Sequence, residues 1–298
     1  MPIELIAPAK VNLALEVTGR RPDGYHEVVS VAQTIDLADR VVLDLATTIE
    51  LEVAGEKLLG VPLEGPRNLA YRAAVALAAE AGRAHLGARI RLEKQIPAGV
   101  GLGGGSSDAA AVLRGLNRLW RLDLPLDALV RVAATVGSDV PFLLHGGAAL
   151  VTGRGERVAL LPDSAPLECT LFVSDVEVED KTRRMYAALT PADFSDGRRA
   201  RILAESLRRG LPVVETDLVN AFDRHVAEVA PPLARARDVC REAGLAVHAC
   251  GSGPGFFTCA PLSDIPRILL RELDREWGVV AVACRSLGRA AATALREA

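Results

Sequence analysis

A glycine-rich stretch constrains this chain more than any other feature. It reads Pro97-Ala98-Gly99-Val100-Gly101-Leu102-Gly103-Gly104-Gly105-Ser106-Ser107 and leads into a helix expected over 106–120. Glycine lets the backbone approach a ligand closely and take positive φ angles. The free N–H groups and the dipole at a helix start attract anions, and serine is a good N-cap. We therefore predict that residues 97–107 cradle a polyphosphate.

The alternative is a purely structural strand-to-helix turn, which five glycines followed by two serines make less favoured. The stretch is not a Walker A loop, because no Gly-Lys-Ser/Thr ends it. It also lacks the acidic residue after the next strand that a dinucleotide-binding fold uses. Asp108 lies in the first helical turn, where it is expected to complement the helix dipole rather than bind metal. No side chain is predicted as a metal ligand.

Composition excludes several function classes. Half of the 298 residues are hydrophobic and the formal net charge is −3, so the chain can bury a sizeable core and shows no basic footprint for nucleic acid. No run reaches the ~20 apolar residues of a membrane helix, and the N-terminus does not resemble a signal peptide. The five cysteines form no Cys-x-x-Cys pair, which favours reduced thiols over disulfides or zinc. We expect a cytoplasmic protein that binds neither nucleic acid nor membrane.

Periodicity predicts strands and helices that interleave in both halves. Pro22-Asp23-Gly24 predicts a tight turn between two early strands. The segment 161–166 is the best candidate linker, which gives domains 1–162 and 163–298. Interleaved elements in two layers indicate an α+β or α/β fold. The strands are expected at 10–18, 25–35, 40–45, 49–53, 88–94, 148–152, 157–160, 169–174, 256–260 and 279–285. The helices are expected at 68–81, 106–120, 126–136, 182–189, 200–209, 217–229, 232–243 and 265–276.

Three ordered motifs resemble those of the GHMP kinases, a superfamily that includes galactokinase, homoserine kinase and mevalonate kinase. They are Ala7-Pro8-Ala9-Lys10-Val11-Asn12-Leu13, the glycine-rich stretch itself, and Cys250-Gly251-Ser252-Gly253-Pro254-Gly255. The resemblance implies an α+β, two-domain architecture. Its N-terminal domain would be a ribosomal-protein-like βαβ unit, and its C-terminal domain a ferredoxin-like α/β sandwich. It also implies ATP and Mg²⁺, because the charge of the transferred phosphoryl group must be neutralised.

Two further segments resemble one family within that superfamily, the 4-diphosphocytidyl-2-C-methyl-D-erythritol kinases of the non-mevalonate isoprenoid pathway. They are Gly19-Arg20-Arg21-Pro22-Asp23-Gly24-Tyr25-His26-Glu27 and Val136-Gly137-Ser138-Asp139-Val140-Pro141-Phe142. The resemblance implies that Asp139 is the general base and that Lys10 stabilises charge near the γ-phosphate. It implies cytosine contacts for Tyr25 and His26, further substrate contacts for Asn12 and Thr182, and a place for Asn68 near the adenine. Two residues apart on a strand, Lys10 and Asn12 share one face.

Each of these residues also has an ordinary structural interpretation. Alone, Lys10 reads as a strand-edge charge, Asp139 as a turn or cap, and Tyr25-His26 as packed aromatics. The segment before Thr182 departs from the family pattern, because it is acidic at 177–180 and about two residues longer. Rival functions are another GHMP kinase, of the homoserine or mevalonate type, and a nucleotide-binding module without catalysis. The expected partner is a cytidine diphosphate conjugate of methylerythritol, bound by a monomer or homodimer.

Overall fold

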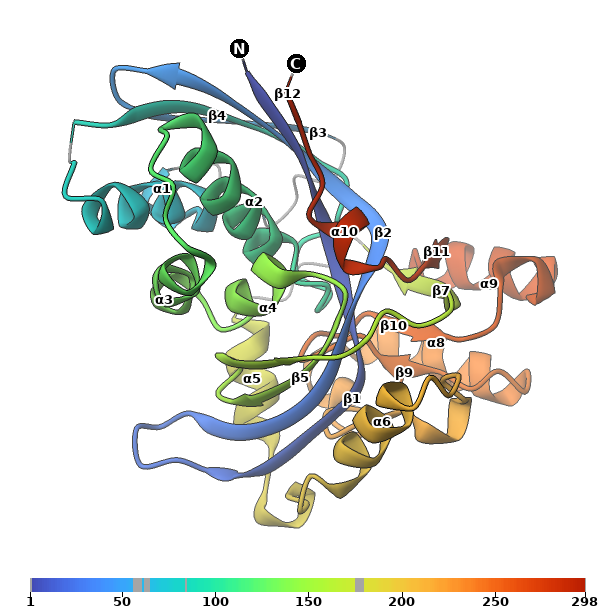
Figure 1. Ribbon diagram of the computed structural model, residues 1–298. Helices are drawn as coiled ribbons and strands as arrows, with labels where there is room; N and C mark the ends of the chain where they lie inside the picture. Colours follow the sequence, from blue (N-terminus) through green and yellow to red (C-terminus); the bar gives the residue numbers. More distant parts are fainter. Residues whose placement is uncertain (1, 56–60, 62–64, 84, 175–179, 298) are drawn as a thin grey trace.

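The computed structural model describes residues 2–55, 61, 65–83, 85–174 and 180–297, and it shows a mixed α+β protein (Figure 1). Two long strands, β1 (Ile3–Arg20) and β2 (His26–Ala46), form an antiparallel hairpin that runs through the molecule. The predicted turn joins them: Tyr25 N–H donates to Asp23 Oδ1 at 3.2 Å, and Gly24 has a φ of +86°. The two short strands predicted at 25–35 and 40–45 are therefore parts of one continuous strand.

The larger sheet is built around this hairpin. Its order is β12-β1-β2-β4-β3, with β5 on the other half of β2, β6 beside β5, and β8 parallel to β1. The added strands are β3 (Ile49–Gly55), β4 (Gly87–Lys94), β5 (Ala148–Gly153), β6 (Arg157–Leu160), β8 (Val219–Asn220) and β12 (Leu295–Glu297). Because β8 and β12 come from the second half of the chain, this sheet joins both halves.

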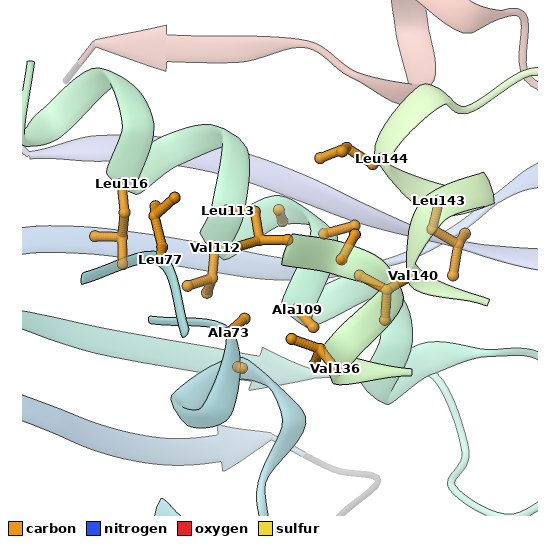
Figure 2. Close-up of a cluster of buried hydrophobic side chains, with 14 of the residues drawn as sticks. Ala73, Leu77, Ala109, Val112, Leu113, Leu116, Val136, Val140, Leu143 and Leu144 are labelled. Atoms are coloured by element: carbon orange, nitrogen blue, oxygen red, sulfur yellow. The ribbon is translucent and has the colours of Figure 1, made fainter. Parts of the chain in front are cut away.

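Helix α2 (Gly104–Leu119) packs on β1, β2 and β4, and α1 (Leu69–Glu80), α3 (Leu126–Val136) and α4 (Val140–His145) pack around α2. Their apolar faces meet around α2, where Leu77, Leu113 and Leu116 are fully buried (Figure 2). At about 1.5–3 kcal/mol for each buried aliphatic side chain, this core holds α2, the helix that follows the glycine-rich loop, in place.

The second sheet is antiparallel and has the order β11-β7-β10-β9. Its strands are β7 (Glu168–Val173), β9 (His248–Ala249), β10 (Phe256–Thr258) and β11 (Val280–Arg285), and the helices of this half are α5 (Lys181–Ala188), α6 (Arg198–Arg208), α7 (Val226–Val229), α8 (Pro231–Glu242), α9 (Arg267–Trp277) and α10 (Arg289–Ala292). Phe172 and Phe256 stack at 4.8 Å in the core between them.

The helix predicted at 217–229 is wrong. This segment contains the end of a 3-10 turn, strand β8 and only the short helix α7. Asn220 explains the difference, because its Nδ2 donates to the carbonyls of Ala249 and Gly251 at 2.9 and 3.1 Å. Hydrogen bonds from a side chain to the backbone of another segment can outweigh the helix propensity of the local sequence.

In the part of the chain that the structure describes, no helix is long and apolar enough to cross a membrane. All five cysteines are free.

Candidate active site

The strand β1 changes register where the first motif lies. Its pairing with β2 shifts between Pro8 and Lys10 and again between Asn12 and Ala14. At the first shift β2 is two residues longer than β1, because Pro8 pairs with Ala38 and Lys10 with Thr34. On either side of this irregularity the buried residues of β1 enter different cores: Leu5 and Ala7 belong to the core under α2, whereas Val11 and Leu13 belong to the core shared with the second half. Lys10 and Asn12 alternate with these residues and line a cleft.

Backbone hydrogen bonds bring the three motifs together at this irregular strand. Lys10 N–H donates to the carbonyl of Leu102 at 2.9 Å, and Asn12 N–H donates to the carbonyl of Cys250 at 2.9 Å. The N–H of Gly255 in turn donates to Val100 at 3.1 Å. Strand β1, the glycine-rich loop and the second glycine turn therefore form one connected unit.

Lys10 and Asn12 are held by a buried chain of side-chain hydrogen bonds. Lys10 Nζ donates to Asn12 Oδ1 at 2.7 Å, and Asn12 Nδ2 donates to Ser30 Oγ at 2.7 Å. Ser30 Oγ donates to the carbonyl of Ala14 at 2.6 Å. Lys10 is only 5% exposed. These hydrogen bonds orient the Asn12 oxygen toward the ammonium group of Lys10. Lys10 and Asn12 therefore lie on the same face of β1, as predicted.

Glycine is required where the loop packs against its neighbours. Gly103 has a φ of +73° and precedes α2, which begins at Gly104 and not at the predicted Ser106. A Cβ at Gly103 would lie 3.1 Å from Lys10 Cγ, and one at Gly253 would lie 2.4 Å from the N of Gly101. A side chain at either position would displace Lys10 or separate the two glycine turns.

The loop residues divide into those that line hollows and those that lie behind them. Ser107 lies behind: its Oγ donates to the carbonyl of Pro8 at 2.7 Å and its N–H to Gly103, so it holds α2 against β1. The Val100 side chain is buried in the core that also contains Val11 and Leu13. The predicted loop residues that line a hollow are Pro97, Ala98, Gly99, Gly101, Leu102, Gly103, Gly104, Gly105 and Ser106.

Asp139 stands at the start of α4, opposite Lys10. Asp139 Oδ2 lies 3.7 Å from Lys10 Nζ, and the Asp139 side chain is 46% exposed while that of Lys10 is 6% exposed. The loop formed by Gly137 and Ser138 carries it to the cleft. A half-exposed carboxylate beside a buried ammonium group can accept a proton from a hydroxyl in the cleft.

Two adjoining hollows meet at this pair. The larger is a cleft of about 1710 Å³, and the smaller, of about 340 Å³, lies along the glycine-rich loop. Lys10, Asp139, Lys181, Thr182 and Ser252 line both. Among the described residues, six cationic side chains line the larger cleft against two carboxylates: Lys10, Arg20, Arg67, Arg154, Lys181 and Arg183 against Asp139 and Asp180. This excess of positive charge suits anionic ligands.

Aromatic rings line the far end of the larger cleft. The His26 ring stacks on Tyr186 at 5.0 Å and meets Phe194 edge-on at 6.1 Å. The Tyr25 ring is 51% exposed, and the Arg154 guanidinium lies 5.2 Å from its centroid. Burial, followed by the charge of Arg20, lowers the pKa of His26, so its imidazole is neutral near pH 7. A neutral imidazole beside exposed rings can contact a flat, polar heterocycle.

The two remaining predicted residues occupy different places. Thr182 follows Lys181 on α5 and lines both hollows. Asn68 is the N-cap of α1, where its Oδ1 accepts from Ala70 N–H at 2.9 Å, and it borders only the smaller hollow. Most of the acidic segment before Thr182 lies outside the described residues; in the described part, Asp180 pairs with Arg183.

A buried charge cluster lies beneath the glycine-rich loop. Lys94 donates to Asp39 and, at 2.5 Å, to Asp108, and all three side chains are at most 3% exposed. Burial, the dominant cause, raises the pKa of Asp108 to about 7. Asp108 therefore belongs to a structural ion cluster, and its expected role at the helix dipole is replaced by this pairing.

No group of three or more His, Cys, Asp or Glu side chains suited to a metal occurs among the described residues.

Sequence reasoning missed Arg154 and Lys181, and it assigned no contact to Tyr186. Tyr186 matches the family pattern together with Thr182, which lies four residues earlier on the same face of α5. Arg154 follows a β5 strand whose position in the sheet comes from long-range pairing with β2. Lys181 lies 82 positions after Gly99 in the sequence, and no local sequence pattern indicates that the two residues approach each other.

The sequence of this chain matches a family model and the sequences of curated proteins. A family model described as the GHMP kinases N terminal domain matches residues 68–147. Curated relatives named 4-diphosphocytidyl-2-C-methyl-D-erythritol kinase are 38% identical in Brevibacillus brevis, over 86% of this chain and 87% of the relative, and 38% identical in Bacillus subtilis, over 84% and 86%. The chain belongs to the 4-diphosphocytidyl-2-C-methyl-D-erythritol kinase family.

Solved structures agree with that assignment. A crystal structure of 4-(cytidine 5'-diphospho)-2C-methyl-D-erythritol kinase is 37% identical and has a TM-score of 0.75, covering 96% of this chain and 99% of that one. A homoserine kinase from Cytophaga hutchinsonii, 18% identical with a TM-score of 0.72, covers 99% and 96% and shares the fold. As a member of the 4-diphosphocytidyl-2-C-methyl-D-erythritol kinase family, the protein is a small-molecule kinase, and the family implies use of ATP. The predicted family and enzyme class are confirmed.

Proposed function

We propose that this protein transfers the γ-phosphoryl group of ATP to the 2-hydroxyl of 4-diphosphocytidyl-2-C-methyl-D-erythritol. One observation carries the proposal: Lys10 and Asp139 face each other where a glycine-lined hollow meets an aromatic, cation-rich cleft. The glycine-lined hollow suits a triphosphate donor. The aromatic, cation-rich cleft suits an acceptor with a ring and a diphosphate.

In this mechanism the chain supplies positioning and electrostatics, which dominate phosphoryl transfer. Backbone N–H groups of the loop from Gly101 to Ser106 hold the triphosphate. Asp139 accepts the proton of the attacking hydroxyl. Lys10, fixed by Asn12, neutralises charge on the transferred group.

For the acceptor, Tyr25 provides an exposed face for the cytosine, and His26 provides polar contacts at its edge. Tyr186 and Phe194 back the His26 ring. Arg154 and the other cleft cations would balance the diphosphate, while Asn12 and Thr182 border the methylerythritol hydroxyls. Homoserine and mevalonate have neither a ring to stack nor a diphosphate to balance.

Mg²⁺ fits this site as a metal that arrives with the nucleotide. Mg²⁺ is usually bound by one or two protein oxygens together with phosphates and waters. The Ser106 hydroxyl is a protein oxygen that the loop side of the cleft offers. When bound, the ion would neutralise phosphate charge.

Steady-state kinetics with the cytidine conjugate, homoserine and mevalonate tests the proposal. We expect strong preference for the conjugate, and we expect Tyr25→Ala to lower its kcat/KM by roughly 10–100-fold, the weight of one stacking contact. Tyr71→Ala, whose ring lines neither hollow, is the control. Equal or better kcat/KM with homoserine or mevalonate would overturn the substrate, and ATP binding with no turnover of any alcohol would favour a non-catalytic module.

Other parts of the proposal follow from the family and the sequence. We infer a cytoplasmic protein, consistent with five free thiols, acting as a monomer or homodimer. We retain a division into domains 1–162 and 163–298. The descriptions of the first as ribosomal-protein-like and of the second as ferredoxin-like stay proposals. The effect of the altered segment 175–182 on substrate preference depends largely on residues outside the described ones.

A further inference from the structure

Lys181 is the first residue of α5, and its side chain returns to the glycine-rich loop. A Cβ at Gly99 would lie 3.6 Å from Lys181 Nζ. Lys181 borders both the larger cleft and the smaller hollow, as Lys10 and Asp139 do. The ammonium group is thus placed at the junction through which a phosphoryl group must pass.

No carboxylate neutralises Lys181 within the described part of the chain. Its neighbour Asp180 pairs with Arg183 instead. Burial, followed by the charge of Lys10, lowers the pKa of Lys181 to about 8. The charged groups that line the junction or flank Lys181 are Lys10, Arg67 and Asp139, with Lys94 and Asp108 deeper in the smaller hollow and Asp180 and Arg183 beside it.

A largely desolvated cation without a partner is costly, and an anion placed against it removes the cost. Lys10 differs, because it already has Asn12 and Asp139 beside it. The unmet charge at the junction therefore belongs mainly to Lys181, which makes it a site for a ligand oxyanion.

We propose that Lys181 binds the transferred phosphoryl group, as a second ammonium group beside Lys10. This inference rests on the proposed kinase function. The hydroxyl oxygen of the acceptor forms a bond to the γ-phosphorus, the bond from that phosphorus to the β,γ-bridging oxygen breaks, the hydroxyl proton passes to Asp139, and ADP leaves. Lys181 exchanges no proton; it contacts oxygens whose charge is redistributed as the group moves.

The test compares Lys181→Met with Arg184→Met, an exposed position on the same helix that lines neither hollow. We expect Lys181→Met to lower kcat by about 10²-fold, the weight of one transition-state contact. Calorimetry without acceptor should show ATP affinity reduced by about tenfold or more relative to ADP affinity. Arg184→Met should change neither quantity.

Lys181→Arg tests the pH dependence of kcat/KM for ATP, which would not change if Lys181 served only in packing. In the wild type, kcat/KM for ATP should fall as pH rises above about 8, where free Lys181 loses its proton. Arginine stays charged, so Lys181→Arg should retain part of the activity and lose this decline.

Two outcomes would overturn the proposal. One is wild-type behaviour of Lys181→Met. The other is a loss confined to kcat/KM for the acceptor with ATP-to-ADP discrimination intact, which would assign Lys181 to the acceptor's own phosphates. Because the nucleotide comparison needs no acceptor, failure of the proposed substrate would leave this result standing.

Discussion

At the scale of single residues, Asp139 carries the most specific expectation. Asp139→Asn keeps the size of the side chain but removes the charge and the proton acceptor 3.7 Å from Lys10. We expect kcat to fall by about 10²–10⁴-fold, with nucleotide affinity little changed, as measured by steady-state kinetics and calorimetry.

Asp127→Asn is the matched control, because Asp127 is an exposed carboxylate on α3 and lines neither hollow. Turnover of Asp139→Asn at the wild-type rate would remove Asp139 from the role of general base.

Residues with strong local signals could be predicted from the sequence. The turn at 22–24, the anion-suited loop and the shared face of Lys10 and Asn12 depend on neighbours within a few positions. The approach of Lys181 to Gly99 and the position of Ser107 behind the loop depend on packing between distant segments. Local sequence patterns do not indicate contacts between distant segments, so these two features could not be predicted before the structure was known.

At the scale of elements, the buried cluster of Lys94, Asp39 and Asp108 joins β4, β2 and α2 beneath the loop. Lys94→Met should lower the free energy of unfolding by about 3–5 kcal/mol at pH 8, because two buried carboxylates lose their cation. The pKa of Asp108 is raised to about 7, so the folded state holds this proton more tightly than the unfolded chain does. The cost of Asp108 to the free energy of unfolding therefore grows as pH rises from about 4, where the unfolded chain ionises, to about 7, where the folded protein ionises. The loss caused by Lys94→Met should be smaller at pH 5, where Asp108 is protonated in the folded protein.

Urea unfolding of wild type and variants at pH 5 and pH 8 measures this difference. Asp108→Asn is the comparison, since it leaves Lys94 balanced by Asp39 and should cost less at pH 8 than Lys94→Met. An equal loss for Lys94→Met at both pH values would contradict the account.

Two features of the secondary structure could not be predicted from local sequence patterns. Alternation continues through β1 without interruption in the sequence, yet Leu5 and Val11, on either side of a shift in the pairing with β2, lie in different cores. The helix expected at 217–229 failed because Asn220 serves the turn at Ala249 and Gly251. In both cases the deciding partner lies far away along the chain.

At the scale of the whole molecule, the two halves depend on each other. One core contains side chains from both halves, including Val11 and Leu171, although residues 162–166 between the halves are exposed. We expect fragments 1–162 and 163–298, produced separately, to lack a cooperative thermal transition by circular dichroism, and we expect co-expression to restore it. A sharp transition in fragment 1–162 alone would show that its own core suffices.

The pairing of β12 with the start of β1 has a practical consequence. Ile3 is opposite Glu297 and Leu5 is opposite Leu295, so both ends of the chain leave the protein at one place (Figure 1). Lys10 lies seven residues beyond Ile3, roughly 20 Å along the strand. An enzyme tethered to a solid support by either end would thus present its cleft in nearly the same orientation, and a short linker could join the two ends for circular permutation.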